Sequence, residues 1–296
     1  MPQFCAKIAA FMSTAVAPPL GAHVSIAGGI SKAITRGEEL GCEAIQVFVK
    51  NASQWVGKPL ADDEVERFRE LHAASPIGPI AAHSTYLINL ASSDPTNRTR
   101  SRRALRDELD RCERLGIPFL VLHPGAHLGA GEKKGLKKVA TSLDNVFRAA
   151  AGGETRILLE NTAGQGTVLG HRLSHLAAIQ ELSAHPDRLG ICLDTCHAFA
   201  AGYPLHEEEG YEALFARIDE LFGRKEPSCL HLNDSKKPFD SRRDRHANIG
   251  KGEIGSDLFA RLVHDTRLRK VPMILETPLG DDDQGHARDL ELLRTF

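Results

Sequence analysis

Short apolar segments alternate with amphipathic segments along most of the chain. From residue 18 onward the apolar segments are rich in β-branched residues and too short for helices, and several are apolar on both faces, as doubly covered strands are. They predict eight strands, over residues 19–26, 44–50, 80–86, 119–125, 156–162, 189–197, 228–234 and 272–278. This alternation is typical of repeated strand-helix units around a parallel sheet.

Between these strands, apolar residues recur at steps of three and four, which places them on one face of a helix. A glycine after such a segment supplies the left-handed residue that ends a helix. The clearest examples are Val65, Phe68, Leu71 and His72 after an expected N-cap at Asp62; Leu105, Leu109, Cys112 and Leu115 before Gly116; and Tyr211, Leu214, Phe215, Ile218 and Phe222 before Gly223.

No Pro/Ser-rich linker separates any two of the strand-helix units. The pattern therefore favours an α/β fold with a single (β/α)8 TIM barrel over an open sheet with a second domain. We expect one domain over residues 19–296 after a flexible N-terminal extension at 1–18. The other interpretation of this extension is that the true start codon encodes Met12 and that the given start lies upstream of it. Catalytic side chains of such barrels come from the carboxyl ends of the strands.

Composition excludes several classes of protein. The 296 residues carry a formal net charge of −2 and are 42% hydrophobic, which argues against a disordered polyelectrolyte. The chain lacks an apolar run of about 18 residues, so a membrane span is not expected. The six cysteines form no repeated short spacing, and we interpret them as reduced thiols of a cytoplasmic protein.

Metal-type side chains follow most of the predicted strands. Six successive strand ends supply His83, His123, Glu160, Asp194 with His197, His231 and Glu276, and Asp244 and His246 follow the seventh strand. Imidazoles and carboxylates without thiolates suit zinc or manganese in a catalytic site. Without cations, such crowded carboxylates would repel one another at a cost of several kcal/mol per unpaired ion, so the sequence predicts a metal cluster.

The number of ligands indicates an open cluster. If Glu160 bridges two ions, these residues fill most of the about twelve bonds that three zinc ions at about four bonds each require. The remaining positions are left for water or substrate. Three divalent ions outweigh the four carboxylates in charge, so the expected ligand is an anion such as a phosphate.

Basic residues gather after the same strand ends, which favours a polyanion track that reads backbone rather than sequence. They are Arg98, Arg100, Arg102 and Arg103; Lys133, Lys134, Lys137 and Lys138; and Lys236, Lys237, Arg242, Arg243 and Arg245. Each group alone is equally compatible with a solvated helix face.

Together these motifs resemble endonuclease IV, the zinc-dependent apurinic/apyrimidinic endonuclease family. The resemblance rests on GAHVSIAGG, QVFVKNASQW, HSTYLINLAS, LHPGAH, LENTAGQG, LDTCHAFAAGY, HLNDSK, DRHANIGKGEIG and ILETP. It implies a TIM barrel and a DNA-repair enzyme acting on duplex DNA with abasic or 3′-blocked damage. Such an enzyme cleaves 5′ to the abasic site and leaves a 3′-hydroxyl and a 5′-deoxyribose phosphate. We expect a monomeric protein that does not bind membranes.

The resemblance also implies three zinc ions, with manganese possible at one position. It assigns His83, His123 and Glu160 to the first ion, Glu160, Asp194, His231 and Glu276 to the second, and His197, Asp244 and His246 to the third. Glu160 is also the expected catalytic residue. In this scheme hydroxide attacks phosphorus in line while the third ion stabilises the departing 3′ oxygen.

Five further residues are expected to contact DNA by the same resemblance: Tyr86, Asn51, Ser53, Gln54 and Trp55. Tyr86 matches a tyrosine that enters the DNA at the lesion, although a core aromatic at a strand end explains its position equally well. Ser53 departs from the family, which often carries an arginine there that helps to wedge open the base stack. A serine cannot fill that gap.

Two other functions remain open. Glu160, Asp194, His231 and Glu276 alone also resemble the single-metal site of a sugar isomerase or epimerase on the same kind of barrel. That enzyme needs none of the additional histidines, whereas a trinuclear phosphodiesterase does. A DNA-damage binder whose zinc ions only shape the surface is the other alternative, although no ligand is missing from the sequence.

Overall fold

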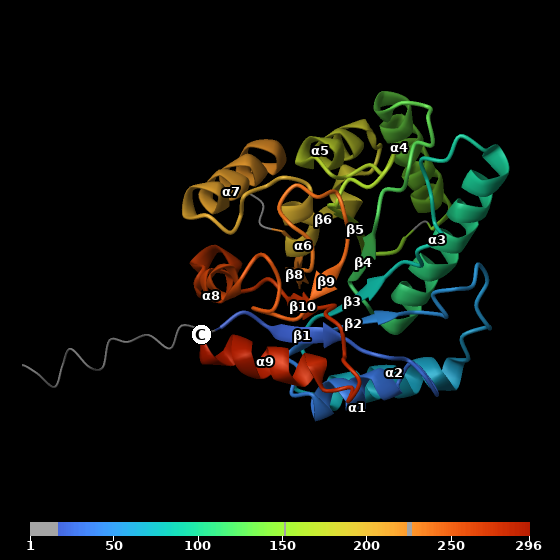
Figure 1. Ribbon diagram of the computed structural model, residues 1–296. Helices are drawn as coiled ribbons and strands as arrows, with labels where there is room; N and C mark the ends of the chain where they lie inside the picture. Colours follow the sequence, from blue (N-terminus) through green and yellow to red (C-terminus); the bar gives the residue numbers. More distant parts are fainter. Residues whose placement is uncertain (1–16, 151, 224–226) are drawn as a thin grey trace, which may run out of the picture.

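Eight parallel strands close into a barrel at the centre of the molecule (Figure 1). The computed structural model describes residues 17–296 apart from 151 and 224–226. Residues 1–16 of the extension expected at 1–18 therefore lie outside the described residues. The barrel strands are β1 (Leu20–His23), β2 (Ala44–Phe48), β3 (Ile80–His83), β4 (Phe119–Leu122), β5 (Arg156–Glu160), β6 (Leu189–Asp194), β7 (Cys229–Leu232) and β10 (Met273–Leu275). Each pairs in parallel with the next, and β10 pairs with β1, which confirms the predicted TIM barrel.

Helices surround this barrel and cover its outer face, except for one short helix, α6, which lies at the carboxyl end of β6 (Figure 1). They are α1 (Lys32–Glu39), α2 (Asp62–Ala74), α3 (Pro95–Leu115), α4 (Glu132–Ala149), α5 (Leu173–Leu182), α6 (Thr195–Ala200), α7 (Glu208–Phe222), α8 (Ser256–His264) and α9 (Gly285–Thr295), with short 3-10 turns at Pro186–Arg188 and Thr266–Leu268. A small antiparallel ladder of β8 (Asp234–Ser235) and β9 (His246–Ala247) precedes α8. No helix in the described residues combines the length and the apolar composition needed to cross a bilayer.

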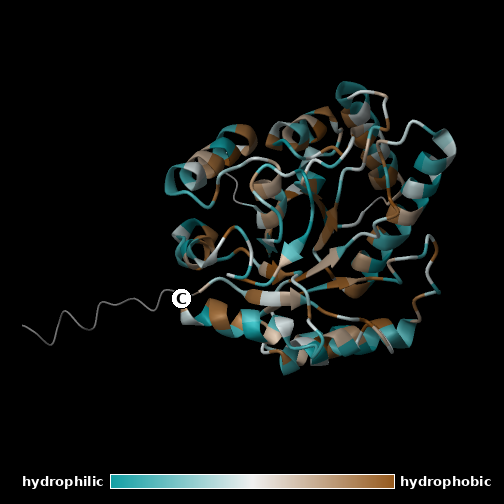
Figure 2. Ribbon diagram, viewed as in Figure 1, coloured by the Kyte–Doolittle hydropathy of each residue, from teal (hydrophilic) through white to brown (hydrophobic). Residues whose placement is uncertain are grey.

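Side chains along each strand point alternately toward the surrounding helices and into the barrel interior, because successive side chains of a strand point to opposite faces. The outward residues join the main apolar core, and most of the strand segments are accordingly brown in Figure 2. The inward apolar residues form a separate layer of Ala44, Val121, Leu158, Cys192, Cys229 and Ile274. Polar residues occupy the next inward position toward the carboxyl end of each strand, so this layer is the floor of a polar site.

Gly21 shows how tightly β1 and β2 approach each other. A Cβ atom at this position would lie 1.6 Å from the carbonyl oxygen of Ala44, which no side chain can occupy. The strand pair therefore requires glycine here because the two backbones approach closely. The backbone φ of Gly21 is not in the left-handed region, so conformational freedom is not the reason.

The predicted helix ends are mostly confirmed. Gly116 and Gly223 have φ of 75° and 71° and end α3 and α7 in the left-handed conformation. The N-cap expected at Asp62 is wrong, because α2 begins at Asp62 and Ala61 is the capping residue. Asp62 instead lies in the first turn, where a carboxylate also interacts favourably with the helix dipole.

Candidate metal centre

Every barrel strand delivers a polar side chain to the same end of the barrel interior. These side chains come from the last strand residues or those just after them: His23, Gln46, His83, His123, Glu160, Asp194, His231 and Glu276. Most are fully buried. On most strands the polar residue follows a residue of the apolar layer by two positions. Side chains two residues apart point to the same face of a strand, so these polar side chains also point into the barrel.

The carboxylate of Glu160 lies between two pairs of histidines. Its Oε2 is 3.1 Å from Nε2 of His83 and 2.9 Å from Nε2 of His123. Its Oε1 is 3.1 Å from Nδ1 of His231 and 3.2 Å from Nδ1 of His197. Glu160 has no exposed surface, so both oxygens are committed to this cluster.

His231 contacts the carboxylates of a second group. Its Nδ1 lies 3.3 Å from Oε2 of Glu276 and 3.9 Å from Oδ2 of Asp194, in addition to Glu160. On the other side of the ring, Nε2 donates to Oε1 of Gln46 at 2.9 Å. That hydrogen bond leaves the Nδ1 lone pair directed at the carboxylates.

A third group lies at the edge of the cluster, where the β8–β9 ladder brings back the loop that follows β7. Oδ2 of Asp244 is 3.1 Å from Nε2 of His197, and its Oδ1 is 3.2 Å from Nε2 of His246. His197 was expected at the end of the sixth strand, but it lies on α6, which begins at Thr195. Asp194 caps that helix by accepting from the His197 backbone N–H at 2.7 Å, so the helical turn sets the position of the imidazole.

Three imidazoles are oriented by backbone carbonyls. Nδ1 of His83 donates to Ser84 O at 2.7 Å, that of His197 to Asn161 O at 3.0 Å, and that of His246 to Glu276 O at 3.1 Å. Their Nε2 lone pairs therefore face carboxylate oxygens. Such an arrangement is repulsive unless a cation or a proton lies between the two atoms.

The electrostatics of the cluster favour added positive charge. Burial alone would lower the pKa of His231, but Glu276 and Glu160 outweigh it and raise the pKa well above its ordinary value. Burial opposes the same effect at His246, where Asp244 raises the pKa to about 9. Burial would raise the pKa of Asp244, yet hydrogen bonds from His197 and His246 lower it far below its usual range. Metal ions can replace the protons that these groups attract.

The residues present fit metal ions. Among the described residues, no Lys or Arg lies within ion-pair distance of Glu160, Asp194, Asp244 or Glu276, so histidines are the only neighbouring groups that can carry positive charge. Nε2 of His246 is buried and faces Oδ1 of Asp244 at 3.2 Å. His83, His123 and Glu160 place one donor atom each within 4.8 Å of one another, as do Asp194, His197 and His246.

His23 and Gln46 also belong to this site, although neither is among the residues predicted from the sequence. Gln46 donates from Nε2 to Oε1 of Glu276 at 2.6 Å and contacts Nδ1 of His23 at 3.0 Å, so it joins two strands to the site. The signal was present, because both residues occupy the inward strand position that carries His83 on β3. Glutamine is a poor metal ligand, although it can orient one.

Tyr86 lies at the mouth of this cluster. Its side chain is 68% exposed, so it is not a core aromatic. Its ring centroid is 5.4 Å from that of His83 and 6.3 Å from that of His123. An aromatic ring in this position is accessible to a large ligand that approaches the cluster.

The loop after β2 carries the other four expected DNA contacts. Asn51 accepts from the backbone N–H and the hydroxyl of Ser53, Gln54 is exposed, and the ring of Trp55 is covered by the guanidinium of Arg100 at 4.5 Å. Within the described ranges none of these four side chains hydrogen-bonds to the metal-type residues. They lie on loops at the same end of the barrel rather than in the cluster.

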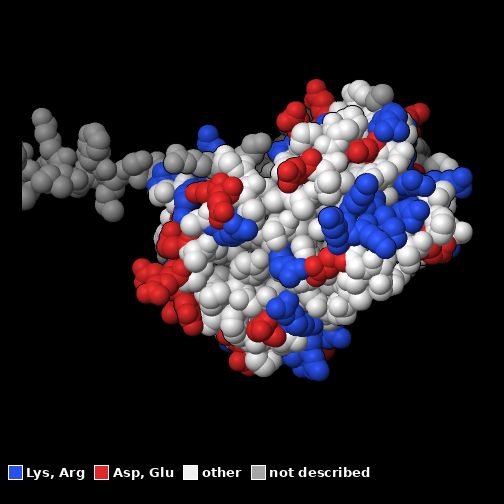
Figure 3. All heavy atoms as spheres, turned by 90° about the horizontal axis from the view of Figure 1, so that it is seen from above, with Lys and Arg blue, Asp and Glu red and all other residues white. Residues whose placement is uncertain are grey.

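The basic groups lie in the first turns of α3 and α4 and in the loop after β7, as expected from their positions in the sequence. Viewed from above, Lys and Arg side chains gather in a patch over the α4 side of the molecule (Figure 3). Some members are already engaged, since Arg98 donates to Ser92 O at 2.7 Å and Arg242 pairs with Asp240 at 2.9 Å. Lys133, Lys134 and Lys137 are exposed.

Comparison with known proteins identifies the family of this chain. The chain matches the family described as a xylose isomerase-like TIM barrel over residues 34–296. It is 49% identical to a probable endonuclease 4 of Chloroflexus aurantiacus over 94% of this chain and 98% of that protein. The crystal structure of endonuclease IV from Thermus thermophilus is 34% identical, with a TM-score of 0.83 over 94% of this chain and 98% of that one.

A D-tagatose 3-epimerase-like protein shares the fold at 19% identity, with a TM-score of 0.69 over 94% of this chain and 96% of that one. This likeness extends to the barrel alone. The identity to the endonucleases is higher, at 49% and 34%, and in both cases covers 94% of this chain. The chain therefore belongs to the endonuclease IV family of enzymes.

Proposed function

We propose that this protein hydrolyses the phosphodiester bond 5′ to abasic sites in duplex DNA, leaving a 3′-hydroxyl and a 5′-deoxyribose phosphate. The observation that carries the proposal is the position of Glu160 between two histidine pairs, with Asp244 joining His197 and His246 beside them. This is one continuous cluster of three donor groups rather than one metal site. The comparison with the endonucleases supports the same reading.

The three groups would each hold one zinc ion. His83 and His123 share the first ion with Glu160; Asp194, His231 and Glu276 share the second with Glu160; His197, Asp244 and His246 hold the third. When bound, zinc lowers the pKa of water and stabilises negative charge on phosphate oxygens. Glu160 would keep the first two ions together and hold their spacing fixed, because its carboxylate is fully buried.

The surrounding residues would orient the substrate. Tyr86 stands over His83 and His123, where its exposed ring can stack against a base or fill the space left by a missing one. The exposed lysines of α4 would attract the DNA backbone without reading its sequence. The five cysteines in the described residues are free and buried, which is consistent with our inference of a cytoplasmic location.

A sugar isomerase is the alternative that the same barrel permits. One divalent ion held by Glu160, Asp194, His231 and Glu276 would suffice for it. The two further groups, in which backbone carbonyls orient His83, His197 and His246, would then have no purpose. This arrangement favours the phosphodiesterase.

The test uses a duplex with one abasic site and an undamaged duplex beside it. We expect the zinc-loaded chain to make one incision on the 5′ side of the lesion, and elemental analysis to find about three zinc ions per chain. Glu160→Gln should fold but lose the paired ions and the incision, whereas Glu253→Gln, at an exposed glutamate, should retain both. Absence of incision by a zinc-replete preparation, with turnover of a ketose in the presence of manganese, would overturn the proposal.

A further inference from the structure

Two cysteines face each other directly beneath the polar cluster. Cys192 on β6 and Cys229 on β7 are register partners in neighbouring parallel strands. Two residues further along the same strands, Asp194 and His231 are partners as well. Because side chains two residues apart share a face, the two thiols lie in the barrel interior one layer below these ligands.

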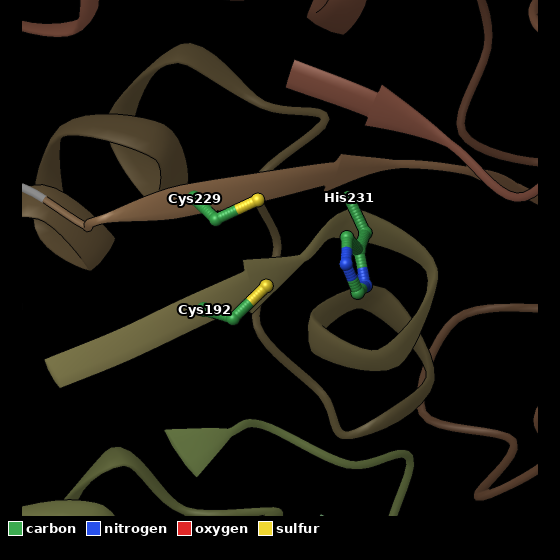
Figure 4. Close-up of side chains that lie close together, drawn as sticks. All are labelled: Cys192, Cys229 and His231. Carbon is green, nitrogen blue, oxygen red and sulfur yellow. The ribbon is translucent and has the colours of Figure 1, made fainter. Parts of the chain in front are cut away.

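The two thiols and His231 form a compact donor set. Figure 4 shows both sulfur atoms directed to the same side, toward the imidazole of His231. One donor atom from each residue lies within 4.8 Å of the others. All three residues are buried, at 1%, 0% and 0% exposure for Cys192, Cys229 and His231.

The surroundings distinguish this set from other cysteines. Cys42 and Cys112 belong instead to the apolar core between the barrel and the helices. The neighbours of the interior pair are Ala44, Val121, Leu158 and Ile274, which are apolar. A divalent cation held by two thiolates carries no net charge, so an apolar layer can accommodate it.

We propose that Cys192, Cys229 and His231 form a second metal site, selective for a soft, thiophilic cation such as Cd²⁺. Thiolate sulfur prefers soft cations, whereas the imidazoles and carboxylates above it suit zinc or manganese. Binding displaces both thiol protons to solvent and forms two metal–sulfur bonds and one metal–nitrogen bond. No oxidation or reduction is involved.

Occupation of this site competes with the cluster above it. Nδ1 of His231 faces Glu160 and Glu276, and its Nε2 is hydrogen-bonded to Gln46. A cation bound to the thiols must therefore take the imidazole from one of these partners. Soft cations should inhibit the enzyme by removing His231 from the second zinc site, and this consequence rests on the proposed function.

The binding test needs neither DNA nor activity. The full chain, stripped of metal by a chelator and kept reduced, is titrated with Cd²⁺ while thiolate-to-cadmium charge-transfer absorption is recorded in the ultraviolet. We expect the band to saturate and to disappear in Cys192→Ala/Cys229→Ala. The matched control, Cys42→Ala/Cys112→Ala, removes two buried thiols outside the barrel interior and should retain the band.

A third variant separates this site from a neighbouring one. Cys196, Asp244 and His246 also lie close together, so Cys196→Ala tests whether the sulfur ligand comes from there. A band that survives in the Cys192/Cys229 variant, or that disappears in Cys196→Ala instead, would overturn the proposal. If the double variant does not fold by circular dichroism, Cys229→Ala alone should still weaken cadmium binding at least tenfold.

Inhibition is measured separately on zinc-loaded protein. Cd²⁺ should abolish incision of abasic duplex by the natural chain, and Cys192→Ala/Cys229→Ala should require at least tenfold more Cd²⁺ while keeping its activity without cadmium. Equal sensitivity of the two proteins would contradict the competition for His231. If the zinc-loaded chain cleaves nothing, the proposed function fails, but the absorption band still decides whether the thiol site exists.

Discussion

The ammonium group of Lys50 lies 2.9 Å from the carboxylate of Glu108, and the two side chains are only 2% and 1% exposed. Glu108 also accepts from the backbone N–H of Thr85, next to Tyr86, at 3.3 Å. Lys50 donates to Trp55 O at 3.1 Å. A single buried ion pair therefore connects the loop after β2 to the segment that carries the exposed tyrosine.

Removing one partner of this pair should be costly. Lys50→Met leaves Glu108 buried without its cation, and we expect the free energy of unfolding to fall by about 3–5 kcal/mol. Lys50→Met/Glu108→Leu should recover most of that loss, because no uncompensated charge remains. Urea denaturation of the three proteins measures the difference, and a double variant less stable than Lys50→Met would refute the explanation.

Gln46 should tune the metal centre without binding metal itself. Gln46→Leu removes the acceptor for His231 Nε2 and the donor to Glu276, so both side chains lose their orientation. Loss of such a supporting contact typically lowers metal affinity by about 10–100-fold. Competition for zinc against a chromogenic chelator measures the change, with Gln284→Leu, at an exposed glutamine, as the control. Equal affinities would show that Gln46 does not orient the ligands.

His175 should make the fold sensitive to mild acid. Burial, aided by His171 and Arg172, lowers the pKa of His175 to about 4, below the value of about 6.5 in an unfolded chain. The unfolded state therefore binds the proton first, and stability should fall as pH drops from about 6.5 toward 4, by at most about 3 kcal/mol.

Denaturation midpoints across this range for His175→Gln and the natural chain test the prediction. The variant should lose stability less steeply over the same pH interval. His264→Gln, which replaces an exposed histidine, should follow the natural chain. A slope in His175→Gln as steep as in the natural chain would mean that another group is responsible.

Ser53 offers a test of the DNA-facing loop. Ser53 is exposed, and its hydroxyl donates to Asn51 at 2.7 Å. Ser53→Arg adds a cation beside the expected duplex, so we expect tighter binding of abasic DNA. If the new arginine contacts one phosphate, the plot of log binding constant against log salt concentration should become steeper by about 0.9.

The matched control is Ala184→Arg, which places the same charge after α5, toward the opposite end of the barrel. Fluorescence anisotropy at several salt concentrations measures both variants. If Ser53→Arg and Ala184→Arg change affinity and slope equally, the effect is general electrostatic attraction and the loop does not contact DNA.

The sequence by itself determined the barrel and most of its reactive end. The eight strands and the helix ends at Gly116 and Gly223 follow from local signals, since apolar periodicity and a left-handed glycine act within a few residues. The residues of the metal centre were predictable for the same reason. Most of them lie at or just after the end of a strand, and parallel strands of a barrel end at one face.

Only the tertiary structure decided how these residues combine. Barrel closure places Glu160 between His123 and His231, whose separations along the chain carry no local signal. The same closure brings Gln46 on β2 to Glu276 after β10, and it pairs Lys50 with Glu108. Strand boundaries were also beyond the sequence, because no Gly or Pro separates Asp194 from Thr195, where the chain turns into α6. Periodicity reports conformation near each residue, whereas contacts between strands depend on the register that the closed barrel imposes.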